Sequence, residues 1–156
     1  MAFIINIDIL KNMNNIQETS EKLLLAFYKI HREEGTILDE VLSFEKNTTW
    51  GASSDNIELL EKLLKLSNES ALDLKNSLKY LKEKGLINFL SEGLLGGEVD
   101  IYNLEISSNA IDIIEGVTGA ETSKSMYQTI FNVKLADNIN LESLLSTKLG
   151  AEFKLF

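Results

Sequence analysis

The residue types that most catalytic and metal sites need are scarce in this chain. It has no Cys, and His31 is its only His. Lack of Cys excludes thiol nucleophiles and thiolate metal sites, and a single His excludes most zinc sites and most Ser-His-Asp triads. Because His31 comes near the end of an expected helix, where the helix dipole favours a cation, we interpret it as structural. We therefore expect no enzyme activity, no metal and no cofactor.

The glycine-rich segments do not contain a nucleotide-binding motif. Residues 119–125 lack the GxxxxGK[ST] spacing of a phosphate loop. Gly93, Gly96 and Gly97 do not form a GxGxxG pattern. We interpret these three glycines as the flexible tip of a hairpin.

Composition restricts the class of protein further. The chain has 156 residues, of which 24 are acidic and 15 basic, for a net charge of -9. This length is typical of one domain, or of one domain with a small appendage. Proteins that wrap nucleic acid are usually basic, because phosphate neutralisation supplies most of their affinity. Arg32 is the only Arg, although Arg is the commonest reader of guanine.

No segment is typical of a membrane protein or of a secreted one. The longest apolar stretch, Phe3–Leu10, is interrupted by Asn6 and Asp8 and is not preceded by Lys or Arg. A signal peptide has a basic start and an unbroken apolar run, and a membrane span needs about 20 apolar residues. Together with the absence of Cys, this predicts a cytoplasmic protein with no membrane partner.

The N-terminal third is expected to hold a strand, two helices and a loop. Apolar residues recur at helical spacing before Gly35, which is typical of a helix end. The only Trp, Trp50, either packs the loop onto the core or contacts a ligand or partner. In order, the expected elements are a strand over Phe3–Leu10, a helix over Gln17–Glu34, a short helix over Thr36–Phe44 and a polar loop over Glu45–Asn56.

The central part has the clearest pattern. Ser70 and Asp73 form a capping box at the start of a helix, which Gly85 ends. The core face of this helix is predicted to be Ala71, Leu74, Leu78 and Leu81. A helix over Ile57–Leu66 precedes this helix. After it we expect a hairpin, with strands over Leu86–Leu90 and Val99–Ile106 and a tip at Ser91–Glu98. The last expected element of this part is a helix over Asn109–Glu115, capped by Ser107 or Ser108.

The C-terminal part is predicted to be an appendage. Met126–Leu135 alternates like a strand, and Leu141–Leu149 has a helical pattern. Ala151–Phe156 is either a last strand or an extension of that helix. We therefore divide the chain into a winged-helix domain over residues 1–116 with an inserted loop at 36–56, a linker at 117–125, and an appendage at 126–156.

The order helix, helix, turn, helix, hairpin, helix is that of a winged helix-turn-helix. Ser70–Ile87 resembles the recognition helix and first wing strand of MarR-like and PadR-like bacterial regulators, and Ile101–Glu115 resembles their later strand and short helix. With Gln17–Glu34 as first helix, the resemblance covers about residues 17–115. Ala110, where such proteins commonly have Gly, and the insertion at 36–56 depart from it. The expected fold is α+β, mainly helical: a winged helix with an N-terminal strand and a C-terminal strand and helix.

The resemblance implies a transcriptional regulator that binds DNA as a homodimer. On the face opposite the core, Asn76 could pair with adenine, and Leu72 could touch a thymine methyl. The DNA-binding residues that we predict on the recognition helix are Leu72, Lys75, Asn76, Lys79 and Tyr80.

Regional charge favours a different function. Residues 93–126 contain six acidic residues and one Lys, so the wing is acidic. Its tip offers Leu94 and Leu95, which either contact a partner protein or fold back on the core. The alternative is therefore an acidic winged-helix module for protein–protein interaction that does not bind DNA. In either case we expect Phe3–Leu10 and Met126–Phe156 to build a homodimer interface, and strands paired between the subunits are one way to form it. The competing interpretation is that both segments fold onto their own subunit as an extra sheet layer.

Overall fold

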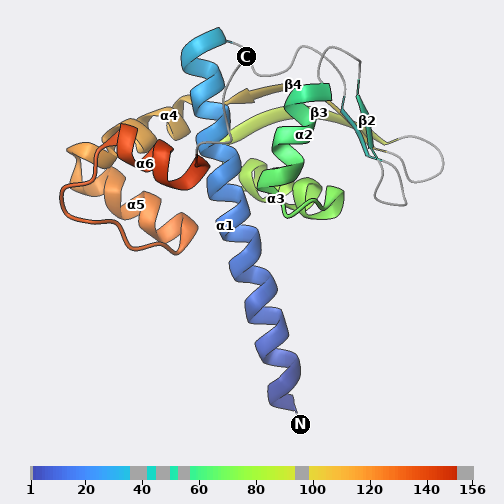
Figure 1. The fold of residues 1–156 in the computed structure, drawn as a ribbon, viewed down its shortest axis with the longest axis horizontal. Helices are drawn as coiled ribbons and strands as arrows, with labels where there is room; N and C mark the ends of the chain where they lie inside the picture. The colour runs from blue at the N-terminus through green and yellow to red at the C-terminus, as the bar shows by residue number, and fades with distance from the viewer. Residues whose placement is uncertain (1, 36–41, 45–49, 53–56, 94–98, 151–156) are drawn as a thin grey trace.

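The computed structural model describes residues 2–35, 42–44, 50–52, 57–93 and 99–150, with side chains described for residues 16–35, 58–91 and 101–150. Its described elements are mainly helical, with one four-stranded antiparallel sheet (Figure 1). Predictions for residues 36–41, 94–98 and 151–156 concern segments outside the described residues. They include the predicted partner contact by Leu94 and Leu95.

Helix α1 (Ala2–Glu34) is the longest described helix, with 33 residues, and its C-terminal half runs between the other elements (Figure 1). The expected strand over Phe3–Leu10 is wrong, because this segment forms the first turns of α1. No Gly or Pro interrupts residues 2–34, and isoleucine lowers helix propensity by only tenths of a kcal/mol. The predicted helix over Gln17–Glu34 is confirmed, and Gly35 follows it with φ +86°. The N-terminal turns of α1 extend away from the other elements (Figure 1).

Helices α2 (Ile57–Leu66) and α3 (Ala71–Glu83) agree with their predicted ranges. The amide of Asp73 donates to Ser70 Oγ at 3.1 Å, so Ser70 is the N-cap. In a full capping box the Ser70 amide would also donate to the Asp73 side chain. It donates to the Ser67 carbonyl instead, so only one of the two expected hydrogen bonds forms. Gly85 follows α3 with φ +72°, a backbone angle that favours glycine.

The predicted hairpin is confirmed as β3 (Ile87–Gly93) and β4 (Val99–Ile106), which pair antiparallel. The first strand is longer than predicted, because residues 91–93, expected in the tip, pair with β4. Two further strands were not predicted. They are β1 (Leu42–Phe44), which pairs with β4, and β2 (Trp50–Ala52), which pairs with β1, so the sheet order is β2-β1-β4-β3. The expectations of a helix at 42–44 and a loop at 50–52 are therefore wrong. Pairing with β4 decides β1, and pairing with β1 decides β2. Segments of three residues are too short for a periodicity argument.

The C-terminal elements are all helical. Helix α4 (Ser108–Glu115) is capped by Ser107, and a 3-10 turn, η2 (Gly116–Thr118), follows. Helix α5 (Glu121–Phe131) overlaps both the expected linker and the expected strand, and the strand prediction is wrong. Helix α6 (Leu141–Leu149) confirms its prediction. A Cβ on Gly116 would collide with the Ser123 side chain, so this glycine allows α5 to fold back over the 3-10 turn.

One hydrophobic core joins these elements. Residues 23–28 of α1 are buried on every side of the helix, because helices and strands surround this stretch. Tyr127 and Phe131 of α5 are buried with them, and their rings meet edge to face at 5.0 Å between centroids. Leu144, Leu145 and Leu149 of α6 belong to the same cluster. The described part of the appendage therefore packs on α1.

Candidate nucleic-acid interface

Helix α3 has the core face that its sequence predicts. Ala71, Leu74, Leu78 and Leu81 are buried. Ser77 is buried as well, which the pattern did not predict, and its hydroxyl has no hydrogen-bond partner among the described residues. With this face fixed by packing, the register of the remaining side chains of α3 is also fixed.

Four of the predicted DNA-binding residues lie on the outward side of α3. Leu72 is 51% exposed and Lys79 is exposed, while Lys75 and Asn76 are half-buried. None of the four side chains makes a hydrogen bond or an ion pair with the described part of the chain. Two ammonium groups and one amide are thus free for an external ligand.

Tyr80, the fifth predicted residue, is directed differently. Its hydroxyl donates to the Ile130 carbonyl of α5 at 2.8 Å, and the Lys84 ammonium lies 5.5 Å from the centre of its ring. A phosphate contact by Tyr80 would have to replace this hydrogen bond. Its visible role is to hold α3 against the C-terminal end of α5.

Lys82, a basic residue of α3 near the hairpin, also contacts other groups of the chain. The Lys82 ammonium donates to the Phe89 carbonyl at 2.8 Å and lies 4.3 Å from the centre of the Phe89 ring. Glu69 and Asp73 lie near the N-terminal end of α3, where a negative charge repels phosphate. The positive charge that α3 offers outward is therefore small and is carried by Lys75 and Lys79.

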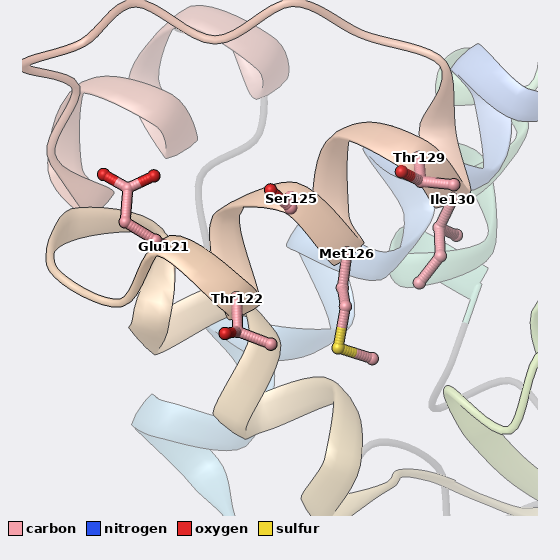
Figure 2. A pocket seen from close by; sticks show the side chains of 6 residues that line it. All are labelled: Glu121, Thr122, Ser125, Met126, Thr129 and Ile130. Carbon is pink, nitrogen blue, oxygen red and sulfur yellow. The ribbon is translucent and has the colours of Figure 1, made fainter.

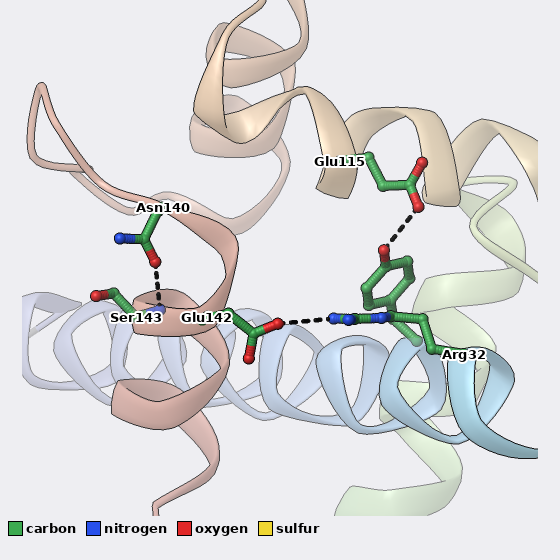
Figure 3. A network of polar contacts seen from close by, with 6 residues as sticks. Arg32, Glu115, Asn140, Glu142 and Ser143 are labelled. Atoms are coloured by element: carbon green, nitrogen blue, oxygen red, sulfur yellow. Dashed lines mark hydrogen bonds and ion pairs between the residues drawn. The ribbon is translucent and has the colours of Figure 1, made fainter.

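Arg32, the only Arg, belongs to an interhelical network (Figure 3). Its guanidinium donates to Glu142 of α6 at 3.0 Å, and this hydrogen bond raises the Arg32 pKa above its ordinary value. Tyr28 of α1 donates to Glu115 of α4 at 2.7 Å. Burial and that acceptor raise the pKa of Tyr28 to about 12. These contacts join α1 to α4 and α6. The Arg32 guanidinium is therefore already paired with a carboxylate of the same chain.

A second polar cluster is buried and was not predicted. Glu21 of α1 has no exposed surface, and the Tyr127 hydroxyl donates to its Oε2 at 2.8 Å. Lys148 of α6 places its ammonium 3.3 Å from Oε1 of the same carboxylate. Burial first, and then the Glu21 charge, raise the pKa of Tyr127. The sequence signal for this cluster was weak: one acidic residue just before the run of leucines from 23 to 25.

A surface hollow follows α5. It has a volume of about 590 Å³, and its described lining comes from one face of that helix (Figure 2). Met126, which is 41% exposed, and Ile130 point to the same side of α5. The lining side chains are Glu121, Thr122, Ser125, Met126, Thr129 and Ile130. They are alcohols and apolar groups with a single carboxylate, which is a contact surface rather than a reaction centre.

Comparison with known proteins adds no relative to this picture: no family model, no curated protein and no solved structure matches the chain. Within the described residues, no group of His, Asp and Glu is arranged to hold a metal ion. None of the described helices is both long and apolar enough to cross a bilayer.

Proposed function

We propose that this protein is a winged-helix DNA-binding protein, a transcriptional regulator that acts as a dimer and inserts α3 into the major groove. The observation that carries the proposal is the outward face of α3. It offers Leu72, Lys75, Asn76 and Lys79 without internal hydrogen-bond or ion-pair partners among the described residues. An exposed helix next to a two-stranded hairpin is a geometry that suits groove binding.

The chemistry of this face fits base and phosphate contacts. An amide such as that of Asn76 can bond to adenine through two hydrogen bonds, and an exposed Leu can pack on a thymine methyl. Lys75 and Lys79 supply charge for phosphates or guanine. The element order also supports the proposal, because β1, between the first and second helices, adds a third strand to the hairpin.

The charge of the chain predicts a weak and salt-dependent complex. With two outward lysines in each of two subunits, about four phosphates would be neutralised. The logarithm of the binding constant should then fall with the logarithm of salt concentration with a slope of about -3.6. Affinity per subunit should be modest, because the protein carries a net charge of -9.

The test is binding to duplex DNA selected from a random 30-base-pair library, measured by fluorescence anisotropy at several salt concentrations. Lys79→Ala should weaken binding on all duplexes. Because it removes one lysine from each of the two subunits, it should also make the salt slope about 1.8 less steep. Asn76→Ala should relax preference at one base position. Lys134→Ala is the matched control, because it removes the same charge from an exposed residue between α5 and α6. An equal effect of the two lysine variants would contradict the proposed interface.

The alternative proposal is an acidic module for protein–protein interaction. It is favoured by the occupied Tyr80 hydroxyl and by exposed Leu90 and Met126, which are 53% and 41% exposed. If no duplex binds at about 50 mM salt, where electrostatic binding is strong, this alternative replaces DNA binding.

Sedimentation equilibrium of the full chain tests the dimer separately. The expected pairing of strands by Phe3–Leu10 and Met126–Phe156 is excluded where the structure describes helices there.

A further inference from the structure

A small pocket opens where α1 meets the C-terminal end of α5 and the last turn of α6. Its volume is about 260 Å³. That is below the ~300–1,000 Å³ range of pockets for drug-sized ligands, so it suits a small molecule. Its polar lining is Gln17, Glu18, Glu21, Asn132 and Lys148, and Phe131 and Val133 supply apolar surface. These residues come from α1, from the end of α5 with the two residues that follow it, and from α6, so α1 meets segments from the far end of the chain.

The carboxylate of Glu21 is the unusual group in this pocket, since none of its surface is exposed. Oε2 accepts a hydrogen bond from Tyr127, but Oε1 accepts none from the described residues. The Lys148 ammonium is 3.3 Å from Oε1, close enough for an ion pair but without hydrogen-bond geometry. A buried charged oxygen without a donor is costly, so a ligand that brings a donor to Oε1 would gain affinity.

The charges select the kind of ligand. A simple anion would draw Lys148 away and leave the buried Glu21 charge unpaired, and a simple cation would displace Lys148 without giving it a new partner. A zwitterion avoids both costs, because its ammonium replaces that of Lys148 on Glu21 while its carboxylate pairs with the released Lys148. The exchange conserves the local charge.

The spacing narrows the class further. Lys148 Nζ lies 3.3 Å from Glu21 Oε1 before a ligand binds. Because Lys148 stays attached to α6, its ammonium can move outward only by the reach of its own side chain, so the two charged groups of the ligand must lie close together. An α-amino acid carries both on one carbon, whereas an ω-amino acid separates them. Lys148, with a side chain that is 31% exposed, lies over the fully buried Glu21 and can move outward.

We propose that this pocket binds a free α-amino acid, with its ammonium on Glu21 Oε1 and its carboxylate on Lys148 Nζ. The amides of Gln17 and Asn132 line the same pocket and can bond to the remaining polar atoms. Val133, half-buried, and Phe131 offer surface to an apolar side chain. This site does not depend on DNA binding, and its test uses the free protein.

The first experiment is saturation-transfer difference NMR on the full-length protein with the twenty common L-amino acids, each at up to about 10 mM. We expect at least one to give a signal, and isothermal titration then gives its affinity. Two matched probes follow: the amine that lacks its α-carboxylate and the acid that lacks its α-ammonium. Each should bind at least about tenfold more weakly, because each leaves one charge of the pair uncompensated. No signal from any amino acid, or equal binding of either probe, would overturn the proposal.

Variants then assign the binding to this pocket. Lys148→Met should weaken amino-acid binding by at least about tenfold, and Lys134→Met, at an exposed position outside the pocket, should leave it unchanged. If Lys148→Met does not fold, Asn132→Gly replaces it. Glycine keeps the left-handed backbone of Asn132, φ 51°, and removes the amide from the pocket. Unchanged affinity in the folded variant would show that the amino acid binds elsewhere.

Discussion

Two tyrosines donate hydrogen bonds to carboxylates, but the two carboxylates lie in different surroundings. Tyr127 donates to Glu21, which is fully buried, and Tyr28 donates to Glu115, which is exposed. Tyr127→Phe would leave Glu21 Oε2 without a donor and with no access to water, so it should cost about 2–3 kcal/mol. Tyr28→Phe should cost about 0.5–1.5 kcal/mol, because water can solvate Glu115. Urea unfolding of both variants checks the difference, and equal losses would contradict the burial of Glu21.

The raised pKa of Tyr28 predicts a loss of stability at high pH. Its pKa is about 12 in the folded chain, compared with an ordinary 10.0. Between these values the unfolded chain releases the phenolic proton while the folded chain keeps it, so stability falls as pH rises. Below pH of about 10 the contribution of Tyr28 is complete. Urea midpoints of Tyr28→Phe should therefore decline less than those of the unmodified protein over this interval. Parallel declines would contradict the shift.

At the scale of single elements, two serine caps can be compared. Ser70 Oγ accepts from the Asp73 amide at the start of α3. Ser107 Oγ accepts from the Ala110 amide and also donates to the Gly85 carbonyl at 2.7 Å, which links α4 to the end of α3. Ser70→Ala should cost about 1 kcal/mol, and Ser107→Ala should cost about 1–2.5 kcal/mol, because it loses two hydrogen bonds.

Ser108→Ala is the control for this pair. Ser108 is the first residue of α4 and is exposed, and its hydroxyl makes no hydrogen bond with the described residues. Its replacement should change stability by less than about 0.5 kcal/mol. The three values come from urea denaturation followed by circular dichroism. If Ser108→Ala lost as much stability as Ser107→Ala, the assignment of the cap to Ser107 would be contradicted.

The elements that could be predicted from the sequence are those with a local start and stop. Helix α3 has a serine cap, a four-residue apolar face and Gly85, and each of these features is present in the structure. Helix α5 was predicted as a strand because Tyr127 and Phe131, four residues apart, also fit an alternating pattern. Packing on α1 decides between the two periods, and a single sequence does not contain that contact.

The two polar sites, the outward face of α3 and the cluster around Glu21, also differ in how far the sequence predicts them. The outward face of α3 follows from its helical period, so Leu72, Lys75, Asn76 and Lys79 could be located without a structure. The cluster around Glu21 could not, because Tyr127 is 106 residues away in sequence and comes from a helix that was predicted as a strand. Sites built from distant segments depend on tertiary packing, which residue spacing does not contain.

At the scale of the whole molecule, the C-terminal helices and α1 share one core. Tyr127, Phe131, Leu144, Leu145 and Leu149 are buried in the cluster that also contains the middle of α1. Removing one buried Leu or aromatic side chain commonly costs about 2–5 kcal/mol, and a whole domain is stable by about 5–15 kcal/mol. Loss of all five groups, about 10–25 kcal/mol if their effects add, is therefore as large as the stability of the whole protein or larger.

A fragment of residues 1–118, which ends after the 3-10 turn, should consequently fail to fold cooperatively, whether or not the full chain is a dimer. Its urea transition should be broad, and its amide proton NMR signals should collapse into a narrow range, while those of the full chain stay dispersed. A fragment with a sharp transition would show that residues 121–149 are a separable appendage. In that case the side of α1 that α5 and α6 cover in the full chain would have to be buried by another surface. A second copy of the fragment could supply that surface, and sedimentation equilibrium would detect such a dimer.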